Sequence, residues 1–370
     1  MVSFFLSILA LLAGYFIYSK VVERIFGITP DVQTPAKAKA DGVDFVEMDW
    51  KRVFLIQFLN IAGLGPIFGA IAGALWGPIA FLWIVLGSIF AGATHDYFSG
   101  MLSVRHSGET IGEIVGRYLG LTAKQVMRVF SVVLLILVGV VFISGPAGLL
   151  QTMSGINKNY FLVLIIIYYI LATVLPIDKI IGKVYPIFGA ALLFMGVGIM
   201  GGILLGDYTI PEISLQSLHP TSKSVFPFLF ITIACGAISG FHATQSPIMA
   251  RCLKNEKEGR RVFYGSMIAE GILALIWAAA AMSFYGSTEA LAAAGAPAVV
   301  VNDISTTLLG VFGGVLAVLG VVAAPITSGD TAFRSARLVI ADAFKYKQEK
   351  LMSRFLIAIP LFAVGIALTF

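Results

Sequence analysis

Long apolar stretches, separated by short charged ones, recur along the whole 370-residue chain. A helix that crosses a bilayer needs about 20 predominantly apolar residues, and ten stretches come close enough to that length. The pattern therefore predicts an all-α polytopic membrane protein. The expected spans are residues 3–19, 53–75, 79–103, 125–148, 160–175, 184–205, 226–250, 263–285, 309–333 and 352–370.

The composition narrows the class of protein further. Hydrophobic residues make up 58% of the chain and charged residues only 12%, whereas soluble domains carry about 25% charged residues. A chain with so few charged residues cannot cover a surface that faces water on all sides. The composition thus excludes a soluble enzyme and a conventional nucleic-acid binder. The 39 glycines are typical of closely packed transmembrane helices.

The basic residues alternate between the predicted loops. Of the 25 Lys and Arg residues, 23 lie in the odd-numbered loops, and only Lys158 and Lys223 lie in the even-numbered ones. Cytoplasmic loops carry the excess of Lys and Arg, so we expect the odd loops in the cytosol and the N-terminus outside. This topology explains the net charge of +5 without a nucleic-acid partner; the lipid bilayer is the expected one.

Gly, Pro and polar residues lie inside three of the predicted spans: they interrupt 53–75 and 226–250, and they end span 309–333 at Pro325–Thr331. In lipid, unwound backbone is tolerated only where it is buried in protein or lines a wet cavity, and interrupted transporter helices bind substrates there. Close helix packing is the alternative, because Gly65, Gly69 and Gly73 form a small-xxx-small series. The candidate substrate-binding residues are Asn60, Gly63, Gly65, Gly236, Ser239, Gly240, His242, Thr244 and Gln245.

The two interrupted spans enter the membrane from opposite sides, and each begins a series of spans. This arrangement predicts a five-plus-five inverted repeat. One extra helix at 3–19 precedes a first repeat at 53–205 and a second repeat at 226–370. Because the second repeat supplies only four spans, we expect the last core helix to be missing and the chain to be a truncated form of a longer protein.

Three acidic residues lie inside the predicted spans. Intramembrane charges are costly and indicate function by default, and a buried carboxylate or a histidine can carry a coupling proton. Asp330 lies in span 309–333, beside the hydroxyls of Thr327 and Ser328. The predicted ion-coupling residues are Asp96, Glu270, Asp330, Thr327 and Ser328, and the histidines that can share this role are His95 and His242.

Each of these acids also has an alternative interpretation. Asp330 and Arg334 stand four residues apart on a helix and can pair with each other. Glu270 can serve as a hydrogen-bond partner for a neighbouring backbone break and nothing more. The dipeptide His95-Asp96 suggests a metal-dependent hydrolase pair, but no further ligands accompany it. No metal or other cofactor is expected beyond a coupling proton or sodium ion.

Five stretches of the chain together resemble the signature of the carbon starvation protein A family. The resemblance covers nearly the whole chain, although Glu47 stands where many members have proline and full-length members continue past Phe370. The stretches are Thr34-Pro35 with Asp41–Val46, Ile61–Gly69, AGATHDYFSG at 91–100, GAISGFHATQSPIMAR at 236–251 and ITSGDTAFRSAR at 326–337.

The resemblance implies a bacterial or archaeal inner-membrane transporter of the amino acid–polyamine–organocation superfamily, with the five-plus-five fold. Members are associated with peptide uptake under carbon starvation, and relatives with proton-coupled pyruvate uptake. By analogy with sodium-coupled members of the superfamily, Thr327 and Ser328 would face a cation together with the carbonyls of Ala62 and Gly65.

The leading hypothesis is a secondary active transporter, not an enzyme, that imports peptides or pyruvate and is coupled to protons in preference to sodium. The sequence has no Walker-type loop, so ATP is not the direct energy source. The alternatives are a non-transporting membrane sensor or truncated transporter, and an intramembrane enzyme, for which G-x-S-x-G and H-E-x-x-H motifs are lacking. The sequence leaves open whether the substrate is a peptide or pyruvate, and whether the coupling ion is a proton or sodium.

Overall fold

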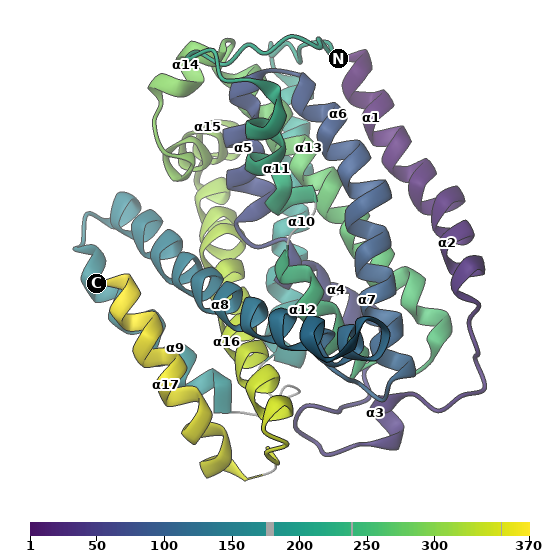
Figure 1. The fold of residues 1–370 in the computed structure, drawn as a ribbon. Helices are drawn as coiled ribbons and strands as arrows, with labels where there is room; N and C mark the ends of the chain where they lie inside the picture. Colours follow the sequence, from purple (N-terminus) through teal and green to yellow (C-terminus); the bar gives the residue numbers. More distant parts are fainter. Residues whose placement is uncertain (175–180, 238–239, 349) are drawn as a thin grey trace.

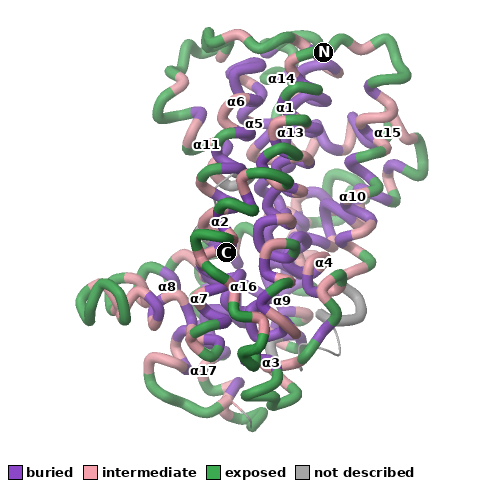
Figure 2. The backbone as a smooth tube through the Cα atoms, turned by 90° about the vertical axis from the view of Figure 1, so that its right-hand side faces the viewer, coloured by how far each residue is buried: buried purple, intermediate pink, exposed green. Residues whose placement is uncertain are grey.

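A computed structural model describes residues 1–174, 181–237, 240–348 and 350–370, with side chains except at 173–185, 235–240 and 349. Helices make up all the regular structure of these residues apart from one isolated bridge, which pairs Met48 with Leu253. The prediction of an all-α protein is confirmed. Buried backbone lies along the middle of the molecule and exposed backbone at its rim, as Figure 2 shows.

Seven helices of the described residues are long and apolar enough to cross a membrane. A bent pair, Trp50–Ile61 and Gly65–Trp76, adds an eighth span. The expected spans 160–175 and 226–250 fall on shorter apolar helices, α9 (Lys158–Val174), α11 (Phe230–Ala237) and α12 (Gly240–Ala250), each of which borders residues outside the described part. The seven helices are Val2–Phe26, Ile79–Arg105, Ile111–Ser154, Pro186–Leu205, Glu256–Tyr285, Pro297–Ala343 and Leu351–Thr369.

Several of these spans contain short π-helical turns between α-helical parts. The first runs through α1 (Val2–Ala13), η1 (Gly14–Tyr18) and α2 (Ser19–Phe26). The third expected span consists of α6 (Ile79–Leu86), η4 (Gly87–Gly92) and α7 (Ala93–Arg105). Later spans comprise α10 (Ile181–Leu205), η7 (Arg260–Tyr264) with α13 (Gly265–Tyr285), and α17 (Leu351–Thr369).

Two expected spans belong to helices longer than the pattern indicated. Span 125–148 lies within α8 (Ile111–Ser154), which is divided by Gly120 at φ 87° and ψ 178°. A positive φ of this kind is readily adopted only by glycine, so the chain turns there before the membrane helix begins. Span 309–333 lies within α15 (Pro297–Ala317, with a break at Gly310), η8 (Val318–Ala323) and α16 (Ala324–Ala343).

The first interrupted span is built around a break in α4 (Trp50–Ile61). The helix begins where the Asp49 side chain accepts a hydrogen bond from the backbone N–H of Lys51, and it ends because Ala62 leaves the helical region at ψ 34°. The chain resumes as η2 (Gly65–Gly69), with Pro66 in its first turn, where a missing N–H costs no hydrogen bond. The two halves are bent by 51°.

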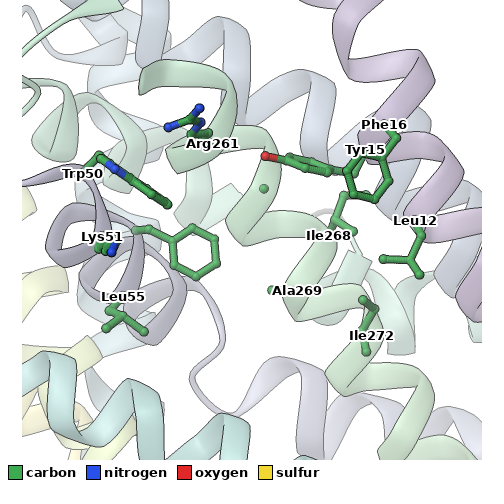
Figure 3. Close-up of a pocket in the computed structure, with 12 residues that line it drawn as sticks. Leu12, Tyr15, Phe16, Trp50, Lys51, Leu55, Arg261, Ile268, Ala269 and Ile272 are labelled. Carbon is green, nitrogen blue, oxygen red and sulfur yellow. The ribbon is translucent and has the colours of Figure 1, made fainter. Parts of the chain in front are cut away.

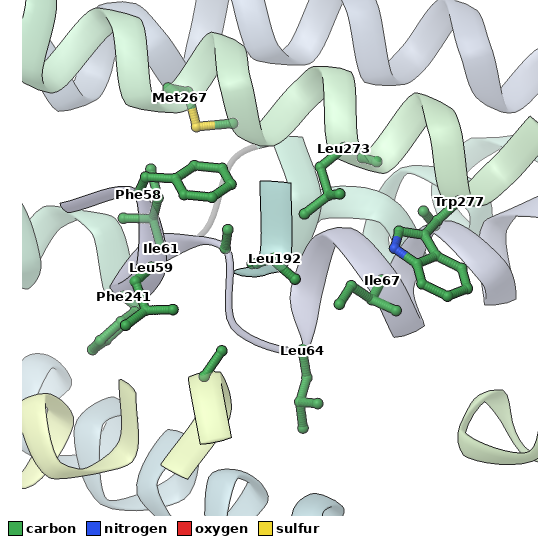
Figure 4. Close-up of a cluster of buried hydrophobic side chains, with 14 of the residues drawn as sticks. Phe58, Leu59, Ile61, Leu64, Ile67, Leu192, Phe241, Met267, Leu273 and Trp277 are labelled. Atoms are coloured by element: carbon green, nitrogen blue, oxygen red, sulfur yellow. The ribbon is translucent and has the colours of Figure 1, made fainter. Parts of the chain in front are cut away.

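The second interrupted span lies beside the first and runs the other way. In Figure 1 the chain rises from α4 to α5 (Ala70–Gly73), whereas it descends from α11 to α12. Residues 238–239, between α11 and α12, lie outside the described part, so the predicted interruption there stays a prediction. Figure 4 shows the apolar core around the first break, where Phe58 lies beside Met267 and Ile67 lies beside Trp277.

The loops separate into two groups at opposite ends of the molecule. At one end, the segments after α2, α7, α12 and α16 contact one another through the pairs Arg105–Glu256 (3.4 Å), Arg251–Asp342 (3.6 Å) and Lys254–Glu47 (3.7 Å). At the other end, the Met1 amino group binds Glu212 at 2.6 Å, and the Thr288 hydroxyl donates to the Leu218 carbonyl. The basic loops after α2, α7, α12 and α16 therefore gather at one end, as their alternation requires.

Candidate functional site

A buried array of two carboxylates and one imidazole lies where three helices meet. Asp96 comes from α7, His242 from α12 and Glu270 from α13, and each side chain is at most 1% exposed. The Nδ1 atom of His242 lies 3.2 Å from an Asp96 oxygen, and its Nε2 atom lies 3.5 Å from a Glu270 oxygen. The imidazole thus stands between two acids that are 174 positions apart in the sequence.

His95 connects this array to the surface. Its Nδ1 atom lies 3.0 Å from the second oxygen of Asp96, and its side chain is 39% exposed. The four groups therefore form a continuous series, Glu270–His242–Asp96–His95, from a fully buried acid to a partly exposed imidazole. Such a series of titratable groups is the arrangement that proton relays in membrane proteins use.

The array is short of positive charge. None of the described Lys or Arg side chains forms an ion pair with Asp96 or Glu270, so the histidines are their only cationic neighbours within ion-pair distance. Both Glu270 oxygens and both His242 nitrogens lack hydrogen-bond geometry to any described partner. The two acids and the two imidazoles can therefore pass protons to one another, and an uncompensated charge on any buried member is costly.

A second polar contact joins the break in α4 to α16. The hydroxyl of Ser328 donates to the Leu59 carbonyl at 3.2 Å and to the Ala324 carbonyl at 3.1 Å. The Thr331 hydroxyl donates to the Asn60 side-chain oxygen at 3.1 Å. Ser328 therefore reaches the backbone of α4 one turn before Ala62 and Gly65, the carbonyls that the family analogy indicated. Thr327 donates within its own helix, to the Ala324 carbonyl at 2.7 Å.

Two buried amides near the break have unused hydrogen-bonding atoms. Among the described residues, no partner reaches the Asn60 side-chain nitrogen or either amide atom of Gln245, and both side chains are fully buried. Thr244 differs, because its hydroxyl donates to the Phe241 carbonyl at 2.8 Å. An unpaired buried amide is unfavourable, so Asn60 and Gln245 are the side chains here that are poised to bind a polar ligand.

A cavity of about 260 Å³ lies between the first break, α8 and α12. Gly65 and Phe68 line it from η2, Phe142 from α8 and Phe241 from α12. A Cβ atom on Gly63 would lie 2.9 Å from the Phe142 ring and 3.3 Å from the Ser328 hydroxyl. A glycine is therefore needed at Gly63, where the backbone passes between the cavity wall and α16.

The remaining predicted residues fall in three places. Gly236 lies near the end of α11 and Gly240 begins α12, while Ser239 lies outside the described residues. Asp330 is fully buried on α16. The structure thus brings Asp96, His242 and Glu270 into one array, and Asn60 and Ser328 into a separate contact, where the sequence had placed them only on neighbouring spans.

A buried ion cluster that the sequence did not predict surrounds Asp44, in the segment before α4. Oxygen Oδ1 of Asp44 lies 3.5 Å from Arg334 and 3.4 Å from Arg337, both on α16. Burial raises the pKa of Asp44, but the guanidinium groups of Arg337 and Arg334 outweigh burial and hold it below its ordinary value of 3.8. Arg334 also donates to the Ala172 carbonyl at 2.7 Å. The motif at Asp41–Val46 was the available signal, but it did not reveal which partner the acid would meet.

Within the described part of the chain, no three His, Cys, Asp or Glu side chains are arranged to hold a metal ion. The sequence model of the family Carbon starvation protein CstA matches residues 1–153 and 145–311.

The chain belongs to the carbon starvation protein CstA family. A relative from Haemophilus influenzae, named "Uncharacterized membrane protein", is 44% identical over 79% of this chain and 93% of its own. The peptide transporter CstA of Helicobacter pylori is 27% identical over 71% of this chain and 48% of its own. The pyruvate/proton symporter BtsT of Escherichia coli is 26% identical over 73% and 47%. The match to these two CstA-family transporters spans about half of their length.

The CstA-family chain also shares its fold with solved transporters. The structure of MhsT in complex with L-phenylalanine has a TM-score of 0.60 at 14% identity, and the match covers 86% of this chain and 79% of that one. The Eremococcus coleocola manganese transporter in complex with an aromatic bis-isothiourea compound has a TM-score of 0.53 at 16% identity, covering 89% and 75%. At these identities the likeness shows the fold alone.

Proposed function

We propose that this CstA-family chain is a secondary active transporter that takes up a small organic nutrient together with protons. The buried array of Asp96, His242 and Glu270 carries the proposal, because it can bind and release a proton beside the break in α4. The names of the relatives, peptide transporter and pyruvate/proton symporter, agree with this class of function. The proposal also includes the role of the family in carbon starvation.

Proton coupling is supported by the make-up of the series Glu270–His242–Asp96–His95, in which every member can carry a proton. Adding or removing one proton changes the buried charge between α7, α12 and α13, and buried charge is costly. A protein that changes its conformation with this protonation state couples proton movement to alternating access.

Sodium is the other coupling ion that the fold suggests, and the contacts favour it less. A sodium site at the α4 break would need the oxygens of Ser328 and of nearby carbonyls. The Ser328 hydroxyl already donates to the Leu59 and Ala324 carbonyls. The Ser328 contact contains no titratable group, whereas the array contains four in series, so protons are the proposed coupling ion.

The proposed substrate is a small carboxylate. The cavity of about 260 Å³ is below the range of about 300–1,000 Å³ for sites that hold drug-sized ligands, and its apolar walls, which include Phe142 and Phe241, suit a short aliphatic group. The unpaired amides of Asn60 and Gln245, which do not line this cavity, suit a carboxylate or carbonyl. Pyruvate meets these requirements more simply than a peptide, and a short peptide is the second candidate.

The location and orientation in the membrane belong to the same proposal. We place the chain in a bacterial or archaeal cytoplasmic membrane, with the N-terminus outside. The support is the gathering of the basic loops at one end of the molecule, which the positive-inside rule assigns to the cytosol. Labelling of single cysteines in intact cells tests it: a cysteine at position 212 should react with an impermeant maleimide, and one at position 257 should not.

The decisive experiment is uptake into proteoliposomes. Labelled pyruvate and labelled dialanine are supplied under a pH gradient and, separately, under a sodium gradient. We expect accumulation of one substrate under the pH gradient by the wild type and by Glu289→Gln, an exposed control acid on α14 (Thr288–Ala293). Glu270→Gln and Asp96→Asn should lose accumulation yet keep exchange of labelled for unlabelled substrate.

Each other result has a definite meaning. Wild-type accumulation in both array variants would remove the array from the coupling mechanism. Accumulation under the sodium gradient alone would overturn proton coupling. Failure of well-folded wild type to take up either substrate would contradict the transporter proposal and support the alternative of a membrane sensor.

A further inference from the structure

A large apolar groove lies on the outside of the molecule, away from the carboxylate array. Its volume is about 530 Å³, and it runs between the first helix, α4 and α13. Figure 3 shows Leu12 and Tyr15 on one wall, Trp50 and Leu55 on the opposite wall, and Ile268 at the back. The helices of this region are otherwise tightly packed, so the groove is a specific gap between the first helix and the rest of the fold.

Two cations stand at the mouth of this groove. Lys51 and Arg261 line it, and both are exposed. The Arg261 guanidinium lies 5.1 Å from the centroid of the Trp50 ring, and the Lys51 ammonium lies 6.0 Å from it. Both charged groups therefore lie beside the Trp50 indole, on one side of the groove.

These cations differ from their neighbours in having no acidic partner. Arg260, next in the chain, pairs with Glu23 at 3.2 Å, and Lys254 pairs with Glu47 at 3.7 Å. In the described portion of the chain, no carboxylate forms an ion pair with Lys51 or Arg261. The mouth of the groove therefore combines two unneutralised charges with a wholly apolar interior.

We propose that the groove binds an anionic phospholipid from the cytosolic leaflet. The lipid phosphate lies between Lys51 and Arg261, and an acyl chain lies along Tyr15, Phe54 and Ile272. The charge complementarity selects an anionic headgroup, because positively charged side chains at the membrane surface attract acidic lipids. The apolar walls select a lipid over a soluble phosphate, and the aromatic Trp50 sits at the headgroup level, where indole rings are favoured.

The lipid is also placed to fasten the first helix to the transport core. It contacts that helix, α4 and α13 at once, and it meets α13 on the side that carries Gly265 and Ile268. Glu270 belongs to the opposite, buried side of the same helix. The lipid site is therefore distinct from the carboxylate array and goes beyond the proposed transport function.

The test uses the fluorescence of Trp50 with brominated lipids, which quench indoles that they contact. The protein is reconstituted in phosphatidylcholine vesicles that contain a minor fraction of either dibrominated phosphatidylglycerol or dibrominated phosphatidylcholine. We expect stronger quenching by phosphatidylglycerol in the wild type, and loss of this extra quenching in Trp50→Phe. In the double variant Lys51→Ala/Arg261→Ala the preference should fall by roughly fivefold for each cation removed.

Two further variants keep the result interpretable. Lys20→Ala/Lys257→Ala removes the same charge from exposed positions that do not line the groove, and it should keep the wild-type preference. Arg261→Lys keeps the charge and should retain most of it, even if the double variant folds poorly. Equal quenching by both lipids in the wild type, or an unchanged preference in the folded double variant, would overturn the proposal. Competition by soluble glycerol phosphate would instead assign the site to free phosphate esters.

Discussion

Asp44→Asn tests whether the segment before α4 is held to α16 by charge. The substitution preserves the size of the side chain, removes its negative charge and turns one acceptor oxygen into a donor NH2 group. Asp44 is 2% exposed and lies 3.5 Å from Arg334 and 3.4 Å from Arg337. The change therefore leaves two buried guanidinium groups without their shared anion.

The size of the effect follows from this burial. Removing one partner of a buried ion pair typically costs about 3–5 kcal/mol, because the remaining charge stays buried and unpaired. Arg334 keeps a bond to the Ala172 carbonyl, and Arg337 keeps one to the Gln348 side chain. Since these partners relieve part of the cost, we expect a loss near the lower end of the range, about 3 kcal/mol.

The same loop offers a matched control. Glu47 pairs with Lys37 and Lys254 at 3.6 and 3.7 Å, but its side chain is 38% exposed. An exposed ion pair contributes about 0–1 kcal/mol, so Glu47→Gln should change stability by less than about 1 kcal/mol. Both variants are unfolded by SDS in dodecyl maltoside micelles, and the transition is followed by tryptophan fluorescence.

The dependence on pH provides a second check. The folded-state pKa of Asp44 is lowered, so its contribution is present above the unfolded value of 3.8 and is lost as pH falls below it. The difference between wild type and Asp44→Asn should therefore stay constant from neutral pH to mildly acidic pH and shrink only at stronger acidity. Equal stability losses in Asp44→Asn and Glu47→Gln would refute the reasoning that burial controls the cost.

Three alanine substitutions at glycines test packing and the cavity. In Gly100→Ala the new Cβ would lie 2.5 Å from the buried Phe263 ring, and we expect a stability loss of about 1–3 kcal/mol in the same SDS titration. Gly148→Ala meets no atom within 4 Å and should instead gain roughly 0.5–1 kcal/mol from helix propensity; equal signs for the two would contradict the packing argument. Gly63→Ala pushes the Phe142 ring toward the cavity, so uptake assays should show a several-fold higher KM with the pH dependence unchanged, and an unaltered KM would separate the cavity from the substrate.

The residues of the carboxylate array show how much of the site could be predicted from the sequence alone. Asp96, His242 and Glu270 stood out because charge inside an apolar span is costly wherever the span finally packs. That argument concerns the cost of burying a single charged residue, and it does not depend on which other residue its side chain contacts. It did not show that His242 stands between the two acids, because that contact depends on how α7, α12 and α13 are placed around one another.

The ends and breaks of the helices show the same difference between what the sequence predicts and what only the structure reveals. The helical segments before Gly120 and Gly310 lie almost entirely outside the predicted spans, and the turns at these glycines were not predicted, since a local φ is not visible in the pattern of apolar residues. The Asp44 cluster was missed for a related reason. A single acid in a polar loop is normally solvated, and only the folded chain shows that this one is buried against two arginines.

The sequence by itself determined the class of protein, the apolar segments and the end of the molecule at which the basic loops gather. These properties follow from the transfer free energy of each residue, which is local and additive along the chain. The tertiary structure alone decided which amides are left unpaired, where the cavity lies and which cations lack an acid. Those properties depend on distances between residues far apart in the sequence, and a difference of a few ångströms there separates an ion pair from a free charge.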